Sequence, residues 1–288
     1  MEEIITTSKE FKNIENNTFE GKVPKMTNSK IIFKGKNNIL YIEDGVQMEN
    51  STIIFNGSDS IIYLSRSKQI YYLDAAVNNN SVLYIGKENY FNGIIHLTAS
   101  DQKNIIIGNN GMFSFNIHIR VSDGHAIFDT QTHAVINAAK SIYIGDHCWI
   151  GFNCAILKGS KIGSGAIIGA SSVVANKNLC SNTSFAGNPV RMISRNVFFT
   201  KESTKNYQDV DVKLHKYFDQ NDFIYENIEE EKISFETMEL ELAPNITNKT
   251  KLDWIKNNLA NNESKNRFFI AAPVENKKRL FGIFKKSN

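Results

Sequence analysis

The residue of this chain best suited to do chemistry is a histidine in the segment Ser122-Asp123-Gly124-His125. A neutral imidazole near pH 7 can take a proton from a hydroxyl group and later return it to a leaving group. The chain has six histidines, and His125 is distinguished by its position just after a break in a regular repeat. His133, in the same segment, is the nearest alternative. His118 could line a cleft, whereas His147 is expected to face outward from the fold as a surface residue.

Other common catalytic and metal-binding patterns are missing from the sequence. It contains no glycine-rich phosphate loop, no serine-hydrolase elbow, no helix-borne pair of histidines and no paired-cysteine motif. Cys148 and Cys154 fall on the small-residue position of the repeat, so we expect buried thiols rather than metal ligands. No metal cofactor is therefore expected.

A six-residue repeat predicts the scaffold that positions these side chains. Apolar β-branched residues recur at Ile144, Ile150, Ile156, Ile162, Ile168 and Val174. Glycine follows four of the isoleucines, and a small residue lies four places after each isoleucine. An amphipathic helix has a period near 3.6 and a half-buried strand a period of 2, so neither explains this spacing. A hexapeptide repeat is typical of a parallel β-helix, in which each short strand forms one side of a coil.

The repeat extends upstream in a looser form. Pairs of isoleucines separated by Asn, Gly, Ser and Asp predict strands and turns from about residue 30 to 180, stacked as one solenoid. Ile119 and Ile144 are 25 residues apart, which is not a multiple of six. The segment of about 120–140 is therefore predicted to protrude, and loops that leave a rigid scaffold often carry function.

Three regions follow from these patterns: a lead-in over 1–29, a solenoid over 30–195 with the protruding loop at about 120–140, and an α-helical region over 203–288. In the last region, Thr250 with Asp253 three residues later predicts a capping box that opens a helix. The fold class expected for the whole chain is an all-β solenoid with a small helical C-terminal region.

Composition limits the function classes. The chain has 288 residues, 41% of them hydrophobic, and a net charge of +3, which is too small to indicate nucleic-acid binding. It has no apolar run long enough to span a membrane and no secretory signal, and its three cysteines favour a reducing, cytoplasmic compartment. The tail 277–286 places five cations around apolar residues, which permits peripheral contact with the inner face of the membrane. Packing on the solenoid, or disorder, is the alternative for that tail.

Three segments of the chain resemble the hexapeptide-repeat acetyltransferases: 142–151, 168–174 and 186–189. The similarity is greatest to the galactoside and maltose enzymes and to bacterial polysaccharide O-acetyltransferases. It implies a left-handed parallel β-helix, a homotrimer with active sites between neighbouring subunits, and acetyl-CoA as co-substrate. Direct transfer of the acetyl group, without a covalent enzyme intermediate, agrees with the lack of an obvious nucleophile.

The resemblance also implies roles for individual residues. His125 matches the family's catalytic histidine on the protruding loop, and Asn92 matches an acceptor-side asparagine once a one-residue insertion is allowed. The residues expected to bind the cofactor are Trp149, Gly151, Gly169, Ala170, Ala175, Lys177, Arg191 and Arg195. The two arginines are the candidates for contact with the coenzyme A phosphates.

The function expected from this reading is acetyl-CoA-dependent O-acetylation of a sugar hydroxyl in a bacterial capsular polysaccharide or lipopolysaccharide, or in its precursor. The long series of N-terminal coils and the C-terminal region would widen the acceptor surface and thus favour a polymer. N-acetylation of an amino sugar and acetylation of a small molecule are alternatives that the histidine base suits equally. A non-catalytic solenoid that binds carbohydrate or scaffolds a complex is the alternative from another class.

Overall fold

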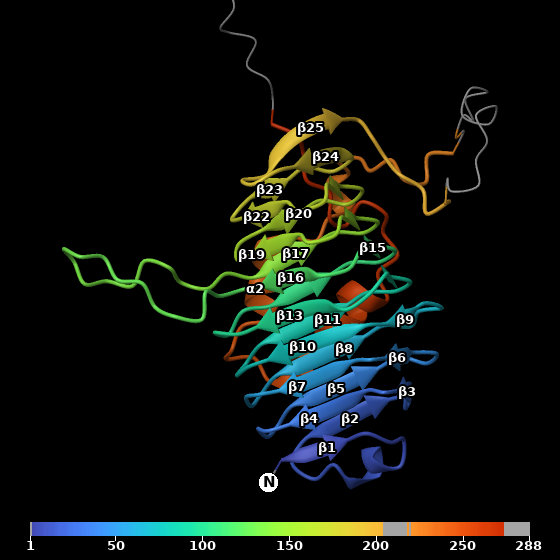
Figure 1. Ribbon diagram of the computed structural model, residues 1–288, viewed down its shortest axis with the longest axis vertical. Coiled ribbons are helices and arrows are strands. Elements are labelled where there is room, and N and C mark those ends of the chain that lie inside the picture. The colour runs from blue at the N-terminus through green and yellow to red at the C-terminus, as the bar shows by residue number, and fades with distance from the viewer. Residues whose placement is uncertain (1, 204–217, 219, 274–288) are drawn as a thin grey trace, which may run out of the picture.

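Short strands stack into three long faces along most of the chain (Figure 1). The computed structural model describes residues 2–203, 218 and 220–273, so the basic tail at 277–286 lies outside the described residues. Neighbouring strands are parallel, except at the two ends, where β1 pairs with β4 and β24 pairs with β25 in antiparallel fashion. The architecture confirms the parallel β-solenoid that the six-residue repeat predicts.

Two of the faces are eight-stranded sheets. Sheet A contains β1 (Glu3–Ile5), β4 (Lys30–Phe33), β7 (Thr52–Phe55), β10 (Leu73–Val77), β13 (Ile95–Ala99), β16 (Ile117–Arg120), β19 (Ala155–Leu157) and β22 (Val173–Ala175). Sheet B contains β2 (Thr18–Gly21), β5 (Ile39–Ile42), β8 (Ile61–Leu64), β11 (Val82–Ile85), β14 (Ile105–Ile107), β17 (Ile142–Ile144), β20 (Lys161–Ile162) and β23 (Asn178–Leu179). A short 3₁₀ helix, η1 (Glu10–Asn13), joins the first strands of the two sheets.

The third face is divided between two sheets. Sheet C contains β3 (Lys25–Thr27), β6 (Gln47–Glu49) and β9 (Ile70–Tyr71). Sheet D contains β12 (Tyr90–Phe91), β15 (Met112–Phe113), β18 (Trp149–Ile150), β21 (Ile167–Ile168), β24 (Thr183–Ala186) and β25 (Arg191–Arg195). Each coil of the solenoid therefore contributes one strand to A, one to B and one to C or D.

Coil length explains why the repeat is regular only in the second half of the chain. Ala155 lies opposite Val173, so that coil has 18 residues, or three hexads. His96 lies opposite His118, and that coil has 22 residues. Leu97 and Ile156 occupy the same position of sheet A, and Ile107 and Ile162 occupy the same position of sheet B. The step from A to B takes ten residues in the longer coil, from Leu97 to Ile107, and six in the shorter coil, from Ile156 to Ile162. The four extra residues therefore lie at the corner between sheets A and B, where they interrupt the six-residue spacing.

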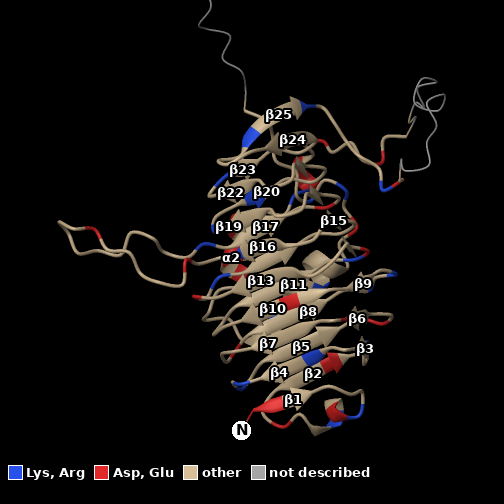
Figure 2. Cartoon of the chain, viewed as in Figure 1, with Lys and Arg blue, Asp and Glu red and all other residues tan. Residues whose placement is uncertain are grey.

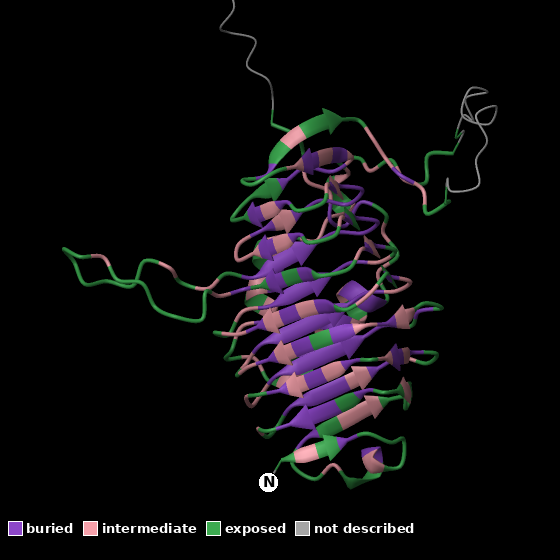
Figure 3. Cartoon of the chain, in the orientation of Figure 1, coloured by how far each residue is buried: buried purple, intermediate pink, exposed green. Residues whose placement is uncertain are grey.

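Buried residues recur on the strands of successive coils (Figure 3), and their apolar side chains form one continuous core cluster. The inward isoleucines of the repeat are almost completely buried, from Ile144 to Ile168. Cys148 and Cys154 are buried free thiols, which confirms their expected place as small core residues. Each such coil adds apolar area removed from water, the main source of stability in a solenoid.

The break in the repeat corresponds to a long arm. Between β16 and β17 the chain leaves the corner of sheets A and B and returns at Ser141, and residues 123–136 are almost all exposed (Figure 3). The coil that contains the arm places His118 opposite Ala155, 37 residues later. The predicted protrusion is therefore confirmed.

The C-terminal region returns along the solenoid and covers the outer face of sheet B. Its helical elements are η3 (Glu229–Glu231), α2 (Phe235–Glu241), α3 (Asn248–Ile255) and the π-helical turn η4 (Lys256–Ala260). Their apolar side chains pack on a ladder of tyrosines at positions 63, 84 and 143. No helix among the described residues is long and apolar enough to cross a membrane.

The helix α3 begins three residues earlier than the sequence pattern indicates. Thr247 is the N-cap, because its side chain accepts a hydrogen bond from the Thr250 amide at 3.2 Å. Asp253 instead lies 3.4 Å from Lys249 in an ion pair one turn earlier. The capping box expected at Thr250 is therefore wrong, because a threonine three residues upstream reaches the free amide first.

A buried ion pair joins the C-terminal region to the coils. Arg267, 1% exposed, donates from Nε to Asp146 Oδ2 at 2.8 Å and from Nη2 to Asp146 Oδ1 at 2.7 Å. The same guanidinium also donates to the Asn262 carbonyl at 2.8 Å. Asp146 raises the pKa of Arg267 against the opposing effect of burial. Each charge is therefore compensated only while the C-terminal region remains docked.

Removal of one partner of this pair should strongly destabilise the protein. We expect Arg267→Leu to lower the free energy of unfolding by about 3–5 kcal/mol, because Asp146 would remain buried without a counter-charge. Urea denaturation measures this change. Glu263→Gln is the matched control, since it removes an ion pair of 2.6 Å to Lys87 whose acidic partner is 74% exposed, and it should cost no more than about 1 kcal/mol. Equal losses in the two variants would contradict the assignment.

Candidate active site

The base of the arm is fixed by a cluster of polar contacts. Asp123 accepts hydrogen bonds from Asn137 Nδ2 at 2.8 Å and from the Lys158 ammonium. Lys158 also donates to the Asn137 carbonyl at 2.8 Å, and the Ser122 hydroxyl donates to Asp101. The bonds from Lys158 and Asn137 lower the pKa of Asp123. The arm therefore leaves the solenoid in a defined direction although most of it is exposed.

His125 is held by its backbone at this base. The Asn137 side chain donates to the His125 carbonyl at 2.9 Å and accepts from the Ile127 amide at 2.7 Å. One amide side chain from the returning side of the arm thus holds the backbone of the outgoing side from His125 to Ile127. The imidazole itself is exposed. This arrangement presents a proton acceptor to solvent, or to a neighbouring surface, on a constrained backbone.

Trp149 lies on a different face of the solenoid. It is in β18 of sheet D, 39% exposed, and its ring centroid lies 5.6 Å from that of Phe199. The arm leaves the corner between A and B, and in a three-sided coil that corner is opposite the face formed by D. The fold therefore does not bring His125 and Trp149 together within one chain.

His147 is buried rather than outward in solvent, so its expected surface position is wrong. Its ring is sandwiched between Phe199 at 4.1 Å and Phe223 at 4.2 Å, and its Nε2 lies 2.9 Å from the Phe199 carbonyl. Desolvation lowers its pKa. The side chain does leave the coil, but segments from later in the chain cover it, and the hexad spacing contains no information about them.

The chain is similar to one described protein family and to a known acetyltransferase. The family described as "Bacterial transferase hexapeptide (six repeats)" matches residues 141–176. A polysialic acid O-acetyltransferase of Escherichia coli O1:K1 / APEC is 33% identical over 144 residues, which are 50% of this chain and 46% of that protein. The chain thus matches about half the length of this curated relative.

Solved structures match over a longer part of the chain. The crystal structure of the polySia specific acetyltransferase NeuO has a TM-score of 0.58 and 31% sequence identity, and the match covers 69% of this chain and 93% of that one. The chain belongs to the hexapeptide-repeat acetyltransferase family. The polysialic acid O-acetyltransferase OatWY, at 20% identity and a TM-score of 0.52 over 71% of this chain and 100% of that one, supports the fold. The solenoid is accordingly a left-handed β-helix.

The residues expected to bind the cofactor are spread over the last coils of this acetyltransferase fold. Ala170, Ala175, Lys177, Arg191 and Arg195 are exposed. Both arginines are on the terminal strand β25, which is the most cationic strand of the third face (Figure 2). Their charge is of the sign that phosphate groups require.

The two predicted cofactor glycines have a packing role in the coils. A Cβ atom on Gly151 would lie 2.6 Å from the Ala170 amide nitrogen, and one on Gly169 would lie 2.9 Å from Ala186 Cβ. Both glycines are thus required by the close approach of successive coils. This requirement is independent of any contact with a cofactor.

Asn92 is exposed on the third face, just after β12. Its Oδ1 accepts a hydrogen bond from the Tyr90 hydroxyl at 3.1 Å. Among the described contacts, none joins Asn92 to His125. Their joint action as acceptor-side and catalytic residues remains a prediction.

The groups that hold His125 in place could not be predicted from the sequence. Asn137, Asp123 and Lys158 form the base of the arm, yet Lys158 comes 33 residues after the histidine. One signal was available: Asp123 is directly next to the Gly124-His125 pair. Among the described residues, no group of three His, Cys, Asp or Glu side chains is placed to hold a metal ion.

The clamp by Asn137 leads to a prediction about local order. Asn137→Ala removes the acceptor of the Ile127 amide, so we expect hydrogen exchange at Ile127 to accelerate about fivefold, as loss of one bond of roughly 1 kcal/mol requires. Hydrogen–deuterium exchange followed by NMR measures this rate. Gln131→Ala, on the exposed tip of the same arm, should leave it unchanged, since only the backbone of Gln131 is bonded there. Unchanged exchange in Asn137→Ala would refute the clamp.

Proposed function

We propose that this protein transfers the acetyl group of acetyl-CoA to a hydroxyl group of a capsular polysaccharide, with polysialic acid as the acceptor. The observation that supports this most is the 31% identity to the polySia specific acetyltransferase NeuO over 93% of that chain. The name of the Escherichia coli relative, a polysialic acid O-acetyltransferase, supports the same acceptor. The exposed histidine on a fixed arm supplies the group that such a reaction needs.

His125 acts as the general base in this proposal. Its imidazole takes the proton of the acceptor hydroxyl while the oxygen attacks the thioester carbonyl carbon. The resulting tetrahedral intermediate collapses with cleavage of the carbon–sulfur bond, and the imidazolium returns the proton to the thiolate. The products are an O-acetyl ester and coenzyme A, and no group on the protein is acylated.

The site is proposed to form between two subunits of a homotrimer. His125 belongs to the corner between sheets A and B, and Trp149 belongs to the opposite face. The arm also exposes four large apolar side chains, Ile127, Phe128, Val135 and Ile136, each more than half exposed. Such a cluster is costly in water and suits docking on a neighbouring protein surface. Docking of the arm on a second copy would bring the histidine of one chain to sheet D of the other.

The coenzyme A portion is proposed to lie along the third face of the last coils. Trp149 offers an aromatic surface there, and Ala170, just after β21, adds only a small side chain to the outer surface. Arg191 and Arg195 on β25 would be placed for the phosphate groups. Ala175 on sheet A and Lys177 at the corner between sheets A and B could contribute only from a neighbouring subunit. These residues would bind and orient the co-substrate, while the proton transfer is assigned to the histidine alone.

A coupled assay tests the function. Purified protein is mixed with acetyl-CoA and polysialic acid, and release of free thiol is followed. We expect release that depends on the polymer, and His125→Ala should lower kcat by a factor of about 10² to 10⁴, the usual contribution of a general base. His133→Ala, farther along the same exposed arm, is the matched control and should retain the rate. Absence of polymer-dependent release, or full activity in His125→Ala, would overturn the proposal.

A mixing experiment tests the location of the site between subunits. His125→Ala and Trp149→Ala are each prepared alone, then unfolded and refolded together. If each site takes its histidine from one subunit and its tryptophan from another, some mixed trimers contain an intact site, and activity reappears above the sum of the two variants. If both residues acted within one chain, no mixed assembly would contain an intact pair and no activity would return.

A further inference from the structure

The third face of the solenoid is interrupted between β9 and β12. Sheet C ends at β9 and sheet D begins at β12, and within the described chain no β-ladder pairs these two strands. The core continues beneath the break, because the rings of Tyr71 and Phe91 lie 5.4 Å apart. A strand edge without a ladder partner has backbone donors and acceptors that water or a ligand must satisfy. The break is therefore a place on this face where a ligand could replace strand pairing.

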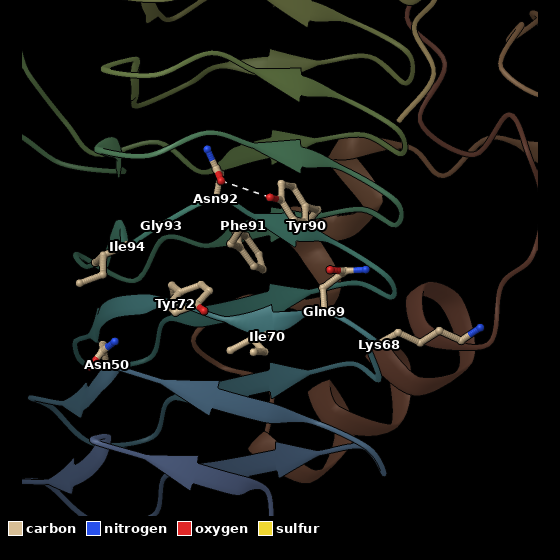
Figure 4. Close-up of a pocket in the computed structure, with 10 residues that line it drawn as sticks. All are labelled: Asn50, Lys68, Gln69, Ile70, Tyr72, Tyr90, Phe91, Asn92, Gly93 and Ile94. Carbon is tan, nitrogen blue, oxygen red and sulfur yellow. Dashed lines mark hydrogen bonds between the residues drawn. The ribbon is translucent and has the colours of Figure 1, made fainter. Parts of the chain in front are cut away.

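A hollow of about 560 Å³ lies over this break (Figure 4). It is lined by residues 68–70 and 72 below the break, residues 90–94 above it, and Asn50 from the preceding coil. Its volume is within the range of sites that hold a small ligand or a part of a larger one. The two strands without a ladder and the turns that flank them together form the depression.

The side chains around the hollow match the chemistry of a sugar. Tyr72 and Tyr90 supply aromatic rings, against which the C–H faces of a pyranose can pack. Asn50, Gln69 and Asn92 supply amides that can both donate to and accept from hydroxyl groups.

The two tyrosines are already oriented by their own contacts. The Tyr90 hydroxyl donates to Asn92 Oδ1 at 3.1 Å, which leaves the amide N–H groups of Asn92 for a ligand. The Tyr72 hydroxyl donates to Glu49 Oε2 at 3.3 Å. The aromatic surfaces are therefore preorganised, which reduces the entropy lost when a ligand binds.

The charge beside the hollow indicates which class of sugar would bind there. Of the described residues that line the hollow, Lys68 is the one that carries a charge, and its side chain is exposed at the end of the site (Figure 4). A cation beside aromatic and amide groups favours a sugar that carries a carboxylate. Sialic acid residues have one carboxylate each, so a polymer of them meets this requirement.

The hollow begins at Asn92, the predicted acceptor-side residue, and extends along the earlier coils away from Trp149. Tyr90, Met112 and Trp149 are consecutive partners in the ladder of sheet D. Successive strands are about 4.8 Å apart, so Tyr90 lies roughly 10 Å from Trp149, and the rest of the hollow extends farther away. One sugar residue cannot reach both places, whereas several linked residues can.

We propose that the hollow between β9 and β12 is a remote subsite that binds a non-reacting residue of the acidic polysaccharide acceptor. The identity of the polymer rests on the proposed function. Binding there holds the chain along the third face while a residue farther along it is acetylated. The subsite therefore favours long acceptors over short ones.

The test compares acceptor lengths in the complete protein. Thiol release is measured with polysialic acid and with the sialic acid dimer, for the wild type, for Lys68→Gln and for Tyr72→Ala. We expect KM for the polymer to rise about tenfold in Tyr72→Ala with kcat retained, and kcat/KM for the dimer to stay the same. Tyr72→Phe, which keeps the ring, should recover most of the polymer affinity. Lys34→Gln, which removes the charge of another exposed lysine, is the control for Lys68→Gln.

Direct binding separates the failure of this inference from failure of the proposed function. Polysialic acid is titrated into His125→Ala without acetyl-CoA, with and without the Lys68 and tyrosine substitutions. Weaker binding in the substituted proteins supports the subsite even if no acetyl transfer is detected, in which case the proposed function alone fails. Equal binding in all of them, or an equal loss of kcat/KM for dimer and polymer, overturns the subsite. Lys68→Gln alters an exposed residue, so its result does not depend on correct folding of Tyr72→Ala.

Discussion

Every strand of this protein has to return to a fixed register above the equivalent strand of the preceding coil. Hydrogen bonds between coils and the stacking of like apolar side chains both depend on that register. Additional residues can therefore be accommodated only at corners. The four extra residues of the coils that begin at β10 and β13 and the arm that carries His125 all leave the solenoid at the corner between sheets A and B.

Sequence alone was most informative where the coils are shortest. From Ile144 the 18-residue coils follow the hexad spacing directly, so fold, core cysteines and the start of the arm could be predicted. Strands β1 to β3 precede residue 30 and belong to longer coils, in which the spacing is not visible. Contacts that join distant segments were also inaccessible, since Arg267 and Asp146 are 121 residues apart and nothing in either neighbourhood indicates the other.

The candidate site, too, could be predicted from the sequence only in part. The position of His125 on a protruding segment could be predicted from the broken period, because a break in register must be accommodated outside the stack. The support of His125 by Asn137 could not be predicted, since a single amide that bridges the two sides of a loop has no sequence periodicity. Likewise, the hollow beside Tyr72 and Tyr90 arises from a missing ladder between two strands, a feature of pairing that only the three-dimensional arrangement contains.

The C-terminal region covers the tyrosine ladder of sheet B with residues that are synthesised after all of the coils. A ribosome releases the coils in order, each able to stack on the one before it, but the outer surface of sheet B stays uncovered until Phe268 has emerged. During that interval the nascent chain presents an aromatic strip along the sheet, the kind of surface that chaperones and other unfinished chains bind. Emergence and docking of the C-terminal region therefore protect this face from aggregation.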